Sequence, residues 1–139
     1  MGDLWHGNIL INPHQHPLRL YILDWELTRT GLPGSEIGLF CANLDVFRRE
    51  NQVAWGPASA VLQNFLDTYS RVSNQDARLA QDTLAHWGTI NVFWAPRDPP
   101  LAGERKLVHE VVREGVRFVV QSRDIDFLAQ SPVKGLLPK

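Results

Sequence analysis

The sequence predicts an α+β fold in which a β-hairpin carries the functional residues and packs on a mainly helical body. Two observations support this prediction. Two apolar runs with a turn between them occupy residues 9–24, and apolar residues recur at helical spacing through most of the chain after residue 35. The 139 residues also fall within the usual size of one domain. We therefore expect a single domain over residues 1–139.

The hairpin is predicted from its two strands and the turn that joins them. Residues 9–11 form a short apolar run, and residues 18–23 alternate well enough to form a partly buried strand. Residues 12–17 contain two prolines and an asparagine, which favour a turn over regular structure. Residues 30–34 are rich in residues that break regular structure, so we expect a loop between the hairpin and the helical part.

Helical spacing of apolar residues predicts four long helices and a short one at the end. Ser35 can cap the first helix, which places Cys41 on its buried face. Three prolines between residues 95 and 100 require a loop there. The expected helices cover residues 35–47, a stretch after Pro57, and residues 75–93, 104–121 and 125–129.

The composition and net charge argue against several classes of protein. The formal net charge is −1 and no Lys/Arg run occurs, which argues against a nucleic-acid partner. No apolar stretch approaches the roughly 20 residues needed to span a bilayer, and the N-terminus lacks the pattern of a secretion signal. The only cysteine, Cys41, cannot form an internal disulfide, which favours a reducing compartment. We expect a soluble, cytoplasmic protein without a membrane partner.

Three polar residues flank the predicted hairpin at a spacing that suggests phosphoryl transfer. Asp3 is followed after four residues by Asn8, which directly precedes the first strand, and Asp24 directly follows the second. An antiparallel hairpin brings its open ends to about 5 Å between facing α-carbons. Asn8 and Asp24 can then share a divalent cation, and their oxygen atoms suit Mg²⁺. Asp3 would be placed to accept the proton of an attacking hydroxyl.

These segments resemble the aminoglycoside phosphotransferase and choline kinase-like family, which has a protein-kinase-like fold. The similarity lies in GDLWHGNIL at residues 2–10 and LDWE at residues 23–26. It implies the C-terminal lobe of such a fold, in which the hairpin carries the metal site. It also implies that Asp3 is the catalytic base, while Asn8 and Asp24 hold Mg²⁺ against the phosphates of ATP. The implied reaction transfers the γ-phosphate of ATP to a hydroxyl group of a small molecule.

Met1 and the missing N-terminal lobe depart from the family pattern, whereas Glu36 is a conservative replacement that is one methylene longer. Met1 stands where family members have a histidine before the Gly-Asp pair. Family members usually place an aspartate at the start of the next helix to brace the catalytic loop, and Glu36 occupies that region here. The glycine-rich loop and the lysine that grip ATP belong to an N-terminal lobe that is absent from this sequence. We therefore expect a truncated lobe with little activity alone.

Other readings stay open at this point. A non-catalytic remnant that serves as a binding or interaction module is the main alternative, and a metal-dependent hydrolase is a distant third. The acceptor could be an aminoglycoside, a choline-like alcohol, a sugar or another metabolite. Trp87 and Trp94 could line an acceptor pocket but suit a core better, and Asp124 could face a cationic acceptor or cap the last helix. Arg48 and Arg49 are interpreted as a solvated helix end.

Overall fold

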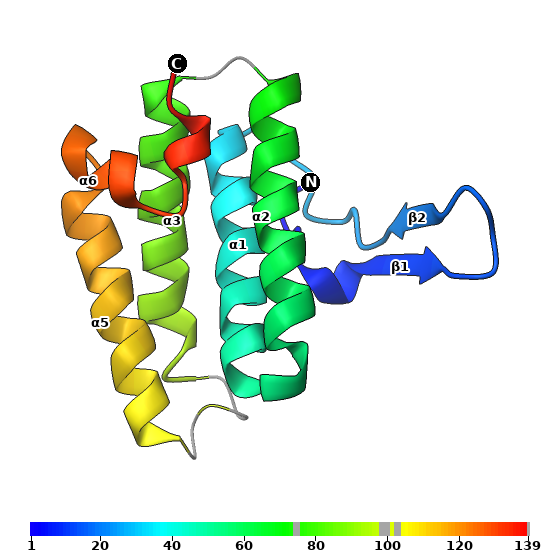
Figure 1. Cartoon of the computed structure of the whole chain (residues 1–139), viewed down its shortest axis with the longest axis horizontal. Helices are drawn as coiled ribbons and strands as arrows, with labels where there is room; N and C mark the ends of the chain where they lie inside the picture. Colours follow the sequence, from blue (N-terminus) through cyan, green and yellow to red (C-terminus); the bar gives the residue numbers. More distant parts are fainter. Residues whose placement is uncertain (74–75, 98–100, 102–103, 139) are drawn as a thin grey trace.

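The structure consists of a β-hairpin that projects from one side of a helical body (Figure 1). It is a computed structural model that describes residues 1–73, 76–97, 101 and 104–138. Strand β1 (Ile9–Asn12) pairs antiparallel with strand β2 (Arg19–Ile22), and Ile9 lies opposite Ile22. The hairpin that the sequence predicted is therefore present in the expected place.

In the part of the chain that the structure describes, the helical body contains four long helices that run side by side (Figure 1). The loop that follows the hairpin leads into the first of them, which begins two residues before the predicted cap because a proline fits the first turn of a helix. The described part is mostly helical with one two-stranded sheet, so the α+β prediction is confirmed. The helices are α1 (Pro33–Glu50), α2 (Trp55–Val72), α3 (Ala77–Trp94), α5 (Arg105–Gln121) and α6 (Ile125–Gln130), with 3₁₀ turns η1 (His6–Asn8), η2 (Gln52–Ala54) and η3 (Lys134–Leu136).

Helix α1 lies at the centre of the core. It packs against α2 and α3, and α3 in turn packs against α5. Cys41 is buried, as its position on the predicted helix required. Trp87 is only 1% exposed and lies edge-on to Phe118 of α5, so it belongs to the core, whereas Trp94 is exposed.

Glycines set the distance between these helices. A Cβ atom on Gly38 of α1 would lie 2.6 Å from the backbone oxygen of Thr83 in α3. Where α3 crosses α5, a Cβ atom on Gly88 would lie 2.4 Å from the backbone oxygen of Gly115. Because such distances are far below van der Waals contact, glycine is required where these helices meet.

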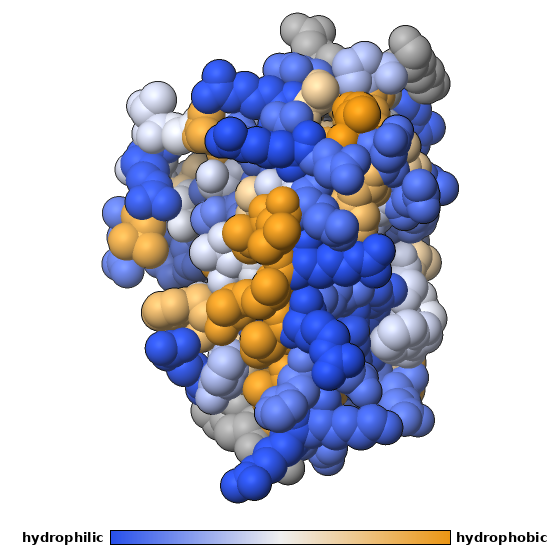
Figure 2. Space-filling view, turned by 90° about the vertical axis from the view of Figure 1, so that its left-hand side faces the viewer, coloured by the Kyte–Doolittle hydropathy of each residue, from blue (hydrophilic) through white to orange (hydrophobic). Residues whose placement is uncertain are grey.

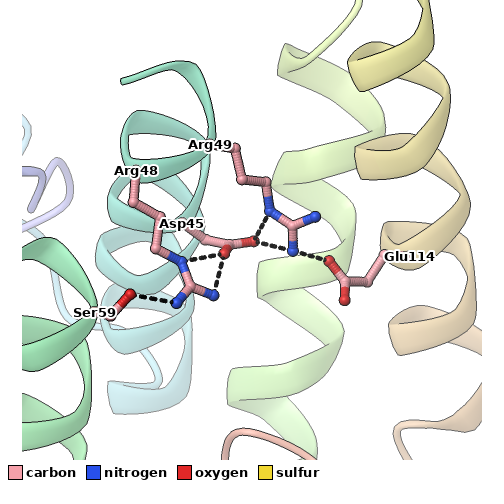
Figure 3. A network of polar contacts seen from close by, with 5 residues as sticks. All are labelled: Asp45, Arg48, Arg49, Ser59 and Glu114. Carbon is pink, nitrogen blue, oxygen red and sulfur yellow. Dashed lines mark hydrogen bonds and ion pairs between the residues drawn. The ribbon is translucent and has the colours of Figure 1, made fainter. Parts of the chain in front are cut away.

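The C-terminal end of α1 corrects one prediction (Figure 3). Arg48 and Arg49 are not solvated, because both bind the buried carboxylate of Asp45, with Arg48 Nε 2.8 Å from Oδ1 and Arg49 Nη2 3.0 Å from Oδ2. Arg49 also pairs with Glu114 of α5, and Arg48 donates to Ser59 of α2 at 2.9 Å. The network ties three helices together. The sequence pattern could not reveal it, because Glu114 lies 65 residues beyond Arg49.

The C-terminal helix begins with a capping aspartate, which is one of the two roles that the sequence allowed for Asp124. Asp124 caps α6, since its Oδ1 accepts hydrogen bonds from the backbone N–H groups of Asp126 at 3.0 Å and Phe127 at 3.1 Å. Among the helices that the structure describes, none has the length and apolar character to cross a membrane.

Candidate functional site

The candidate site begins in the loop that leads into strand β1. Residues His6–Asn8 form a single 3₁₀ turn, after which Ile9 starts the strand. The indole ring of Trp5 lies over Gly7, where a Cβ atom would come within 2.4 Å of the ring. The small residue at position 7 therefore lets the loop turn tightly under the tryptophan.

Asp3 and Asn8 are joined by two hydrogen bonds, a contact that the sequence analysis did not predict. The side-chain amide Nδ2 of Asn8 donates to the backbone oxygen of Asp3 at 3.0 Å and to its carboxylate Oδ2 at 3.2 Å. Asn8 is buried, with 9% exposure, so these bonds are largely shielded from water. Both bonds use the amide nitrogen, which leaves the amide oxygen Oδ1 with its lone pairs for a cation.

Asp24 lies at the other open end of the hairpin. The pairing continues one step beyond the strands, because Leu23 N donates to the backbone oxygen of Asn8 at 2.9 Å. Asp24 is therefore the next residue after the one that faces Asn8, but no direct contact joins its carboxylate to Asn8 or Asp3 in the described part of the chain.

The backbone of Asp24 has an unusual conformation. Its φ of 59° lies in the left-handed region, which few residues other than glycine adopt. Strained conformations of this kind cluster at functional sites, because a required side-chain direction can outweigh the backbone cost. The exposed carboxylate has no hydrogen-bond or ion-pair partner among the described residues, so it is available to a ligand.

A hydrogen bond from α1 holds the start of the loop. Gly2 N donates to Glu36 Oε1 at 2.7 Å, which is the bracing contact that the family resemblance implied for Glu36. Gly2 has a φ of +107°, and a Cβ atom there would lie 2.2 Å from the backbone oxygen of Leu27. Glycine is thus required at this position both for conformation and for space.

His6 has a packing role in this loop. Its ring contacts the rings of Trp5 and Phe47, with centroid distances of 5.2 and 4.8 Å. Burial lowers the pKa of His6 below its ordinary value, because a charged imidazolium would lose its hydration. The neutral ring therefore anchors the loop to α1.

The donor set of this site fits a magnesium ion shared with a phosphate chain. No group of three or more His, Cys, Asp or Glu side chains gathers anywhere in the described ranges. The predicted ligands are one amide oxygen on Asn8 and one carboxylate on Asp24, which are hard oxygen donors. Mg²⁺ typically takes one or two protein ligands and completes its shell with water and phosphate oxygens. The predicted ligand set is of that kind.

A hollow that the sequence did not predict lies at the N-terminal ends of α1 and α3. It has a volume of about 460 Å³, and its lining includes Pro33, Tyr69, Asp76 and Asp82. Local periodicity could not predict it, because its walls form only where the ends of α1, α2 and α3 pack together. Neither Trp87 nor Trp94, the predicted candidates for an acceptor pocket, is among its lining residues.

The comparisons with known proteins point to small-molecule kinases. The chain is 33% identical over 98 residues to the 4-hydroxytryptamine kinase of Psilocybe cubensis, a match that covers 68% of this chain and 26% of that protein. It is 29% identical over 119 residues to the 4-hydroxytryptamine kinase of Psilocybe cyanescens, covering 84% of this chain and 32% of that protein. This similarity fits a kinase-like phosphotransferase relationship.

The matched regions cover only a part of each relative. The chain spans between about a quarter and a third of the length of the two curated relatives. No family model matches the chain, and no solved structure matches it.

Proposed function

We propose that this chain carries the catalytic and metal-binding residues of a kinase that transfers the γ-phosphate of ATP to a hydroxyl group of a small molecule. The observation that supports this most strongly is the contact between Asn8 and Asp3 at the base of the hairpin. It joins the proposed base to a proposed metal ligand across the predicted spacing. The similarity to two small-molecule kinases supports the same reaction class.

Each site residue has one role in this proposal. The carboxylate of Asp3 accepts the proton of the acceptor hydroxyl as that oxygen attacks the γ-phosphorus. The hydrogen bond from Asn8 Nδ2 orients this carboxylate, and Asn8 Oδ1 would be a ligand of the cation. Asp24 supplies the charged ligand. When bound with ATP, Mg²⁺ would neutralise the phosphate charge and so favour transfer.

The acceptor belongs to the class of small hydroxyl-bearing molecules. Both relatives are named as kinases of 4-hydroxytryptamine, which carries a hydroxyl group on an aromatic ring. We propose an acceptor with a hydroxyl group that can reach Asp3 from the open side of the loop, and 4-hydroxytryptamine is the first compound to test.

ATP must also be bound by residues outside the hairpin and the loop that precedes it. Phosphoryl transfer depends on positioning and on charge stabilisation, and the hairpin supplies only the metal ligands. The relatives are about three to four times longer than the stretch they share with this chain. We propose that full turnover needs a nucleotide-binding part equivalent to their additional length.

Metal binding tests the proposed ligand set without requiring turnover. In the ¹H–¹⁵N NMR spectrum of the chain with ATP, paramagnetic Mn²⁺ should broaden the amide signals of residues near Asn8 and Asp24 first. Asp24→Asn should remove this broadening, while Asp126→Asn, an exposed aspartate on α6, should leave it intact. Broadening that is unaffected by Asp24→Asn would refute the ligand set.

A binding module is the second candidate, and the hairpin surface favours it. Leucines, isoleucines and aromatic residues of the hairpin stay exposed on both faces, with Leu20 64% and Ile11 58% exposed. A two-stranded sheet is marginally stable alone, so a covering partner would stabilise it. A chain that binds no hydrophobic dye and stays monomeric at high concentration would count against this function.

A further inference from the structure

An apolar groove lies between α3 and α5. Helix α5 lies on the opposite side of the helical body from the hairpin (Figure 1). Figure 2 faces α5 and shows an apolar band along this surface, bordered on one side by hydrophilic residues. The groove has a volume of about 600 Å³. Its exposed apolar residues are Val92 and Phe93 of α3 and Val116, Val119 and Val120 of α5.

The backbone keeps this groove in place. Gly88 and Gly115 bring α3 and α5 into close contact directly beneath it, since a Cβ atom on Gly88 would lie 2.9 Å from the side chain of Val119. The two helices are thus fixed against each other by backbone contact rather than by long, mobile side chains. The exposed valines have few rotamers, so little entropy is lost when they are covered.

The border of the groove is basic. Arg97 lines it, with its guanidinium 4.3 Å from the centre of the Phe93 ring. Arg113 and Arg117 lie on α5 next to the valines, both exposed to solvent. Arg117 donates to the neutral side chain of Gln121 at 3.0 Å and lies 4.8 Å from the centre of the Phe127 ring, and neither contact carries a negative charge.

The carboxylates of α5 do not cancel this charge. Glu110 and Glu114 line a second hollow together with Arg49, Arg113 and Arg117, so two carboxylates there face three guanidinium groups, and Glu114 is paired with Arg49 of α1. The whole chain has a formal net charge of −1, so the arginines beside the valines form a local excess of positive charge. An apolar groove with basic edges is complementary to an apolar ridge with acidic edges.

We propose that the α3–α5 groove docks an amphipathic helix from another protein, with an apolar stripe that fills the groove and acidic residues that meet Arg97, Arg113 and Arg117. Helices enter grooves of this kind through apolar residues spaced three and four apart. A second copy of the chain fits less well, because a twofold contact would set arginine against arginine.

The test uses the whole chain and two synthetic helical peptides labelled with fluorescein. The acidic peptide carries leucines at positions i, i+3, i+4 and i+7 with glutamates on both flanks, and its twin has lysine in place of every glutamate. Fluorescence anisotropy should show saturable binding of the acidic peptide and not of its twin. Val120→Glu should weaken this binding by roughly tenfold or more.

Val72→Glu provides the matched control. Val72 lies at the end of α2 and is 78% exposed, against 75% for Val120, so both substitutions place the same charge on an exposed helical valine. Circular dichroism should show the same helix content in both variants. The acidic peptide should bind the Val72→Glu chain as tightly as it binds the unchanged chain.

Four results would overturn the proposal. They are no binding of the acidic peptide, equal binding of its lysine twin, equal losses for the two valine variants, and unchanged affinity in Val120→Glu. Sedimentation velocity and flotation with vesicles of phosphatidylcholine and phosphatidylserine identify the other occupants. A dimer or a vesicle-bound form that Val120→Glu removes would assign the groove to a second copy or to lipid instead.

Discussion

At the scale of single residues, the site depends on the hydrogen bonds that hold the loop before β1. Asn8 contacts Asp3, and Glu36 holds Gly2, so the loop is fixed at both ends. The sequence predicted that Asp3 and Asn8 lie near the open end of a hairpin, and the family resemblance implied that Glu36 braces the loop, but the hydrogen bonds between Asn8 and Asp3 were not predicted. The left-handed backbone of Asp24 could not be predicted, because nothing in its local sequence favours that conformation over an extended one.

Removal of the Asn8 amide should destabilise the chain. In Asn8→Ala, the backbone oxygen and carboxylate of Asp3 lose two donors in a largely buried place, which should cost about 1–3 kcal/mol of unfolding free energy. Urea denaturation measures this change. Asn64→Ala removes a single exposed bond to the Ala60 oxygen and should change the free energy by no more than about 0.5 kcal/mol. Equal effects of the two substitutions would contradict the role given to Asn8.

Acid should destabilise the chain through His6 and His86. Burial lowers the pKa of both histidines below the ordinary value of about 6.5, so the unfolded chain takes up protons before the folded chain does. Stability is therefore complete above about pH 6.5 and falls as the pH drops towards the lowered folded-state values. Urea midpoints between about pH 7.5 and about pH 5.5 should show this loss. His6→Phe should reduce it, and an unchanged pH dependence in that variant would contradict the prediction.

At the scale of helices, the structure depends on close contacts and on buried charge. The apolar spacing in the sequence predicted where the helices lie along the chain. It could not predict how closely the helices approach one another, because in a local sequence pattern a glycine indicates only a weak helix former. The structural role of Gly88 and Gly115, which is to allow close backbone contact, is visible only where α3 packs against α5. In the same way, the sequence pattern predicted that Arg48 and Arg49 form a solvated helix end. Only the fold shows that they pair with Asp45 and that Arg49 also pairs with Glu114.

Two glycine-to-alanine substitutions should have opposite effects. In Gly88→Ala the new methyl group would meet the Gly115 oxygen at 2.4 Å, so the helices must separate, at a cost of about 1–3 kcal/mol. Gly56→Ala lies in α2 with no atom within 4 Å of the new group, and should stabilise the chain by about 0.5–1 kcal/mol. Thermal unfolding followed by circular dichroism measures both. A neutral Gly88→Ala would contradict the close crossing of α3 and α5.

The buried carboxylate of Asp45 should contribute more to the free energy of unfolding than its position near a helix end suggests. In Asp45→Asn the two arginines keep their charge but lose their buried counterion, which should cost about 3–5 kcal/mol. Asp126→Asn, on the exposed side of α6, should have an effect of less than about 0.5 kcal/mol. Urea denaturation of both variants is the measurement, and similar midpoints would show that the network of Figure 3 contributes little.

At the scale of the whole molecule, a helical body supports a hairpin that extends away from it (Figure 1). The fold class and the position of the hairpin followed from the sequence, because short apolar runs and helical spacing are local signals. The α3–α5 groove and the hollow beside Tyr69 did not, because each forms only where the surfaces of separate helices pack together, which local periodicity does not specify. The apolar residues of the hairpin also read as partly buried, and here they remain exposed.

A chimera tests most directly whether Asp3, Asn8 and Asp24 form a phosphotransferase site. This chain would replace the matching segment of the 4-hydroxytryptamine kinase from Psilocybe cubensis, which supplies the rest of the enzyme. ADP release with Mg·ATP and 4-hydroxytryptamine is then measured for the chimera and for its Asp3→Asn, Asp24→Asn and Asp126→Asn forms. The account predicts turnover that the first two substitutions reduce by roughly a hundredfold or more and that the third leaves unchanged. A folded chimera that is inactive, or one whose turnover survives Asp3→Asn and Asp24→Asn, would contradict it.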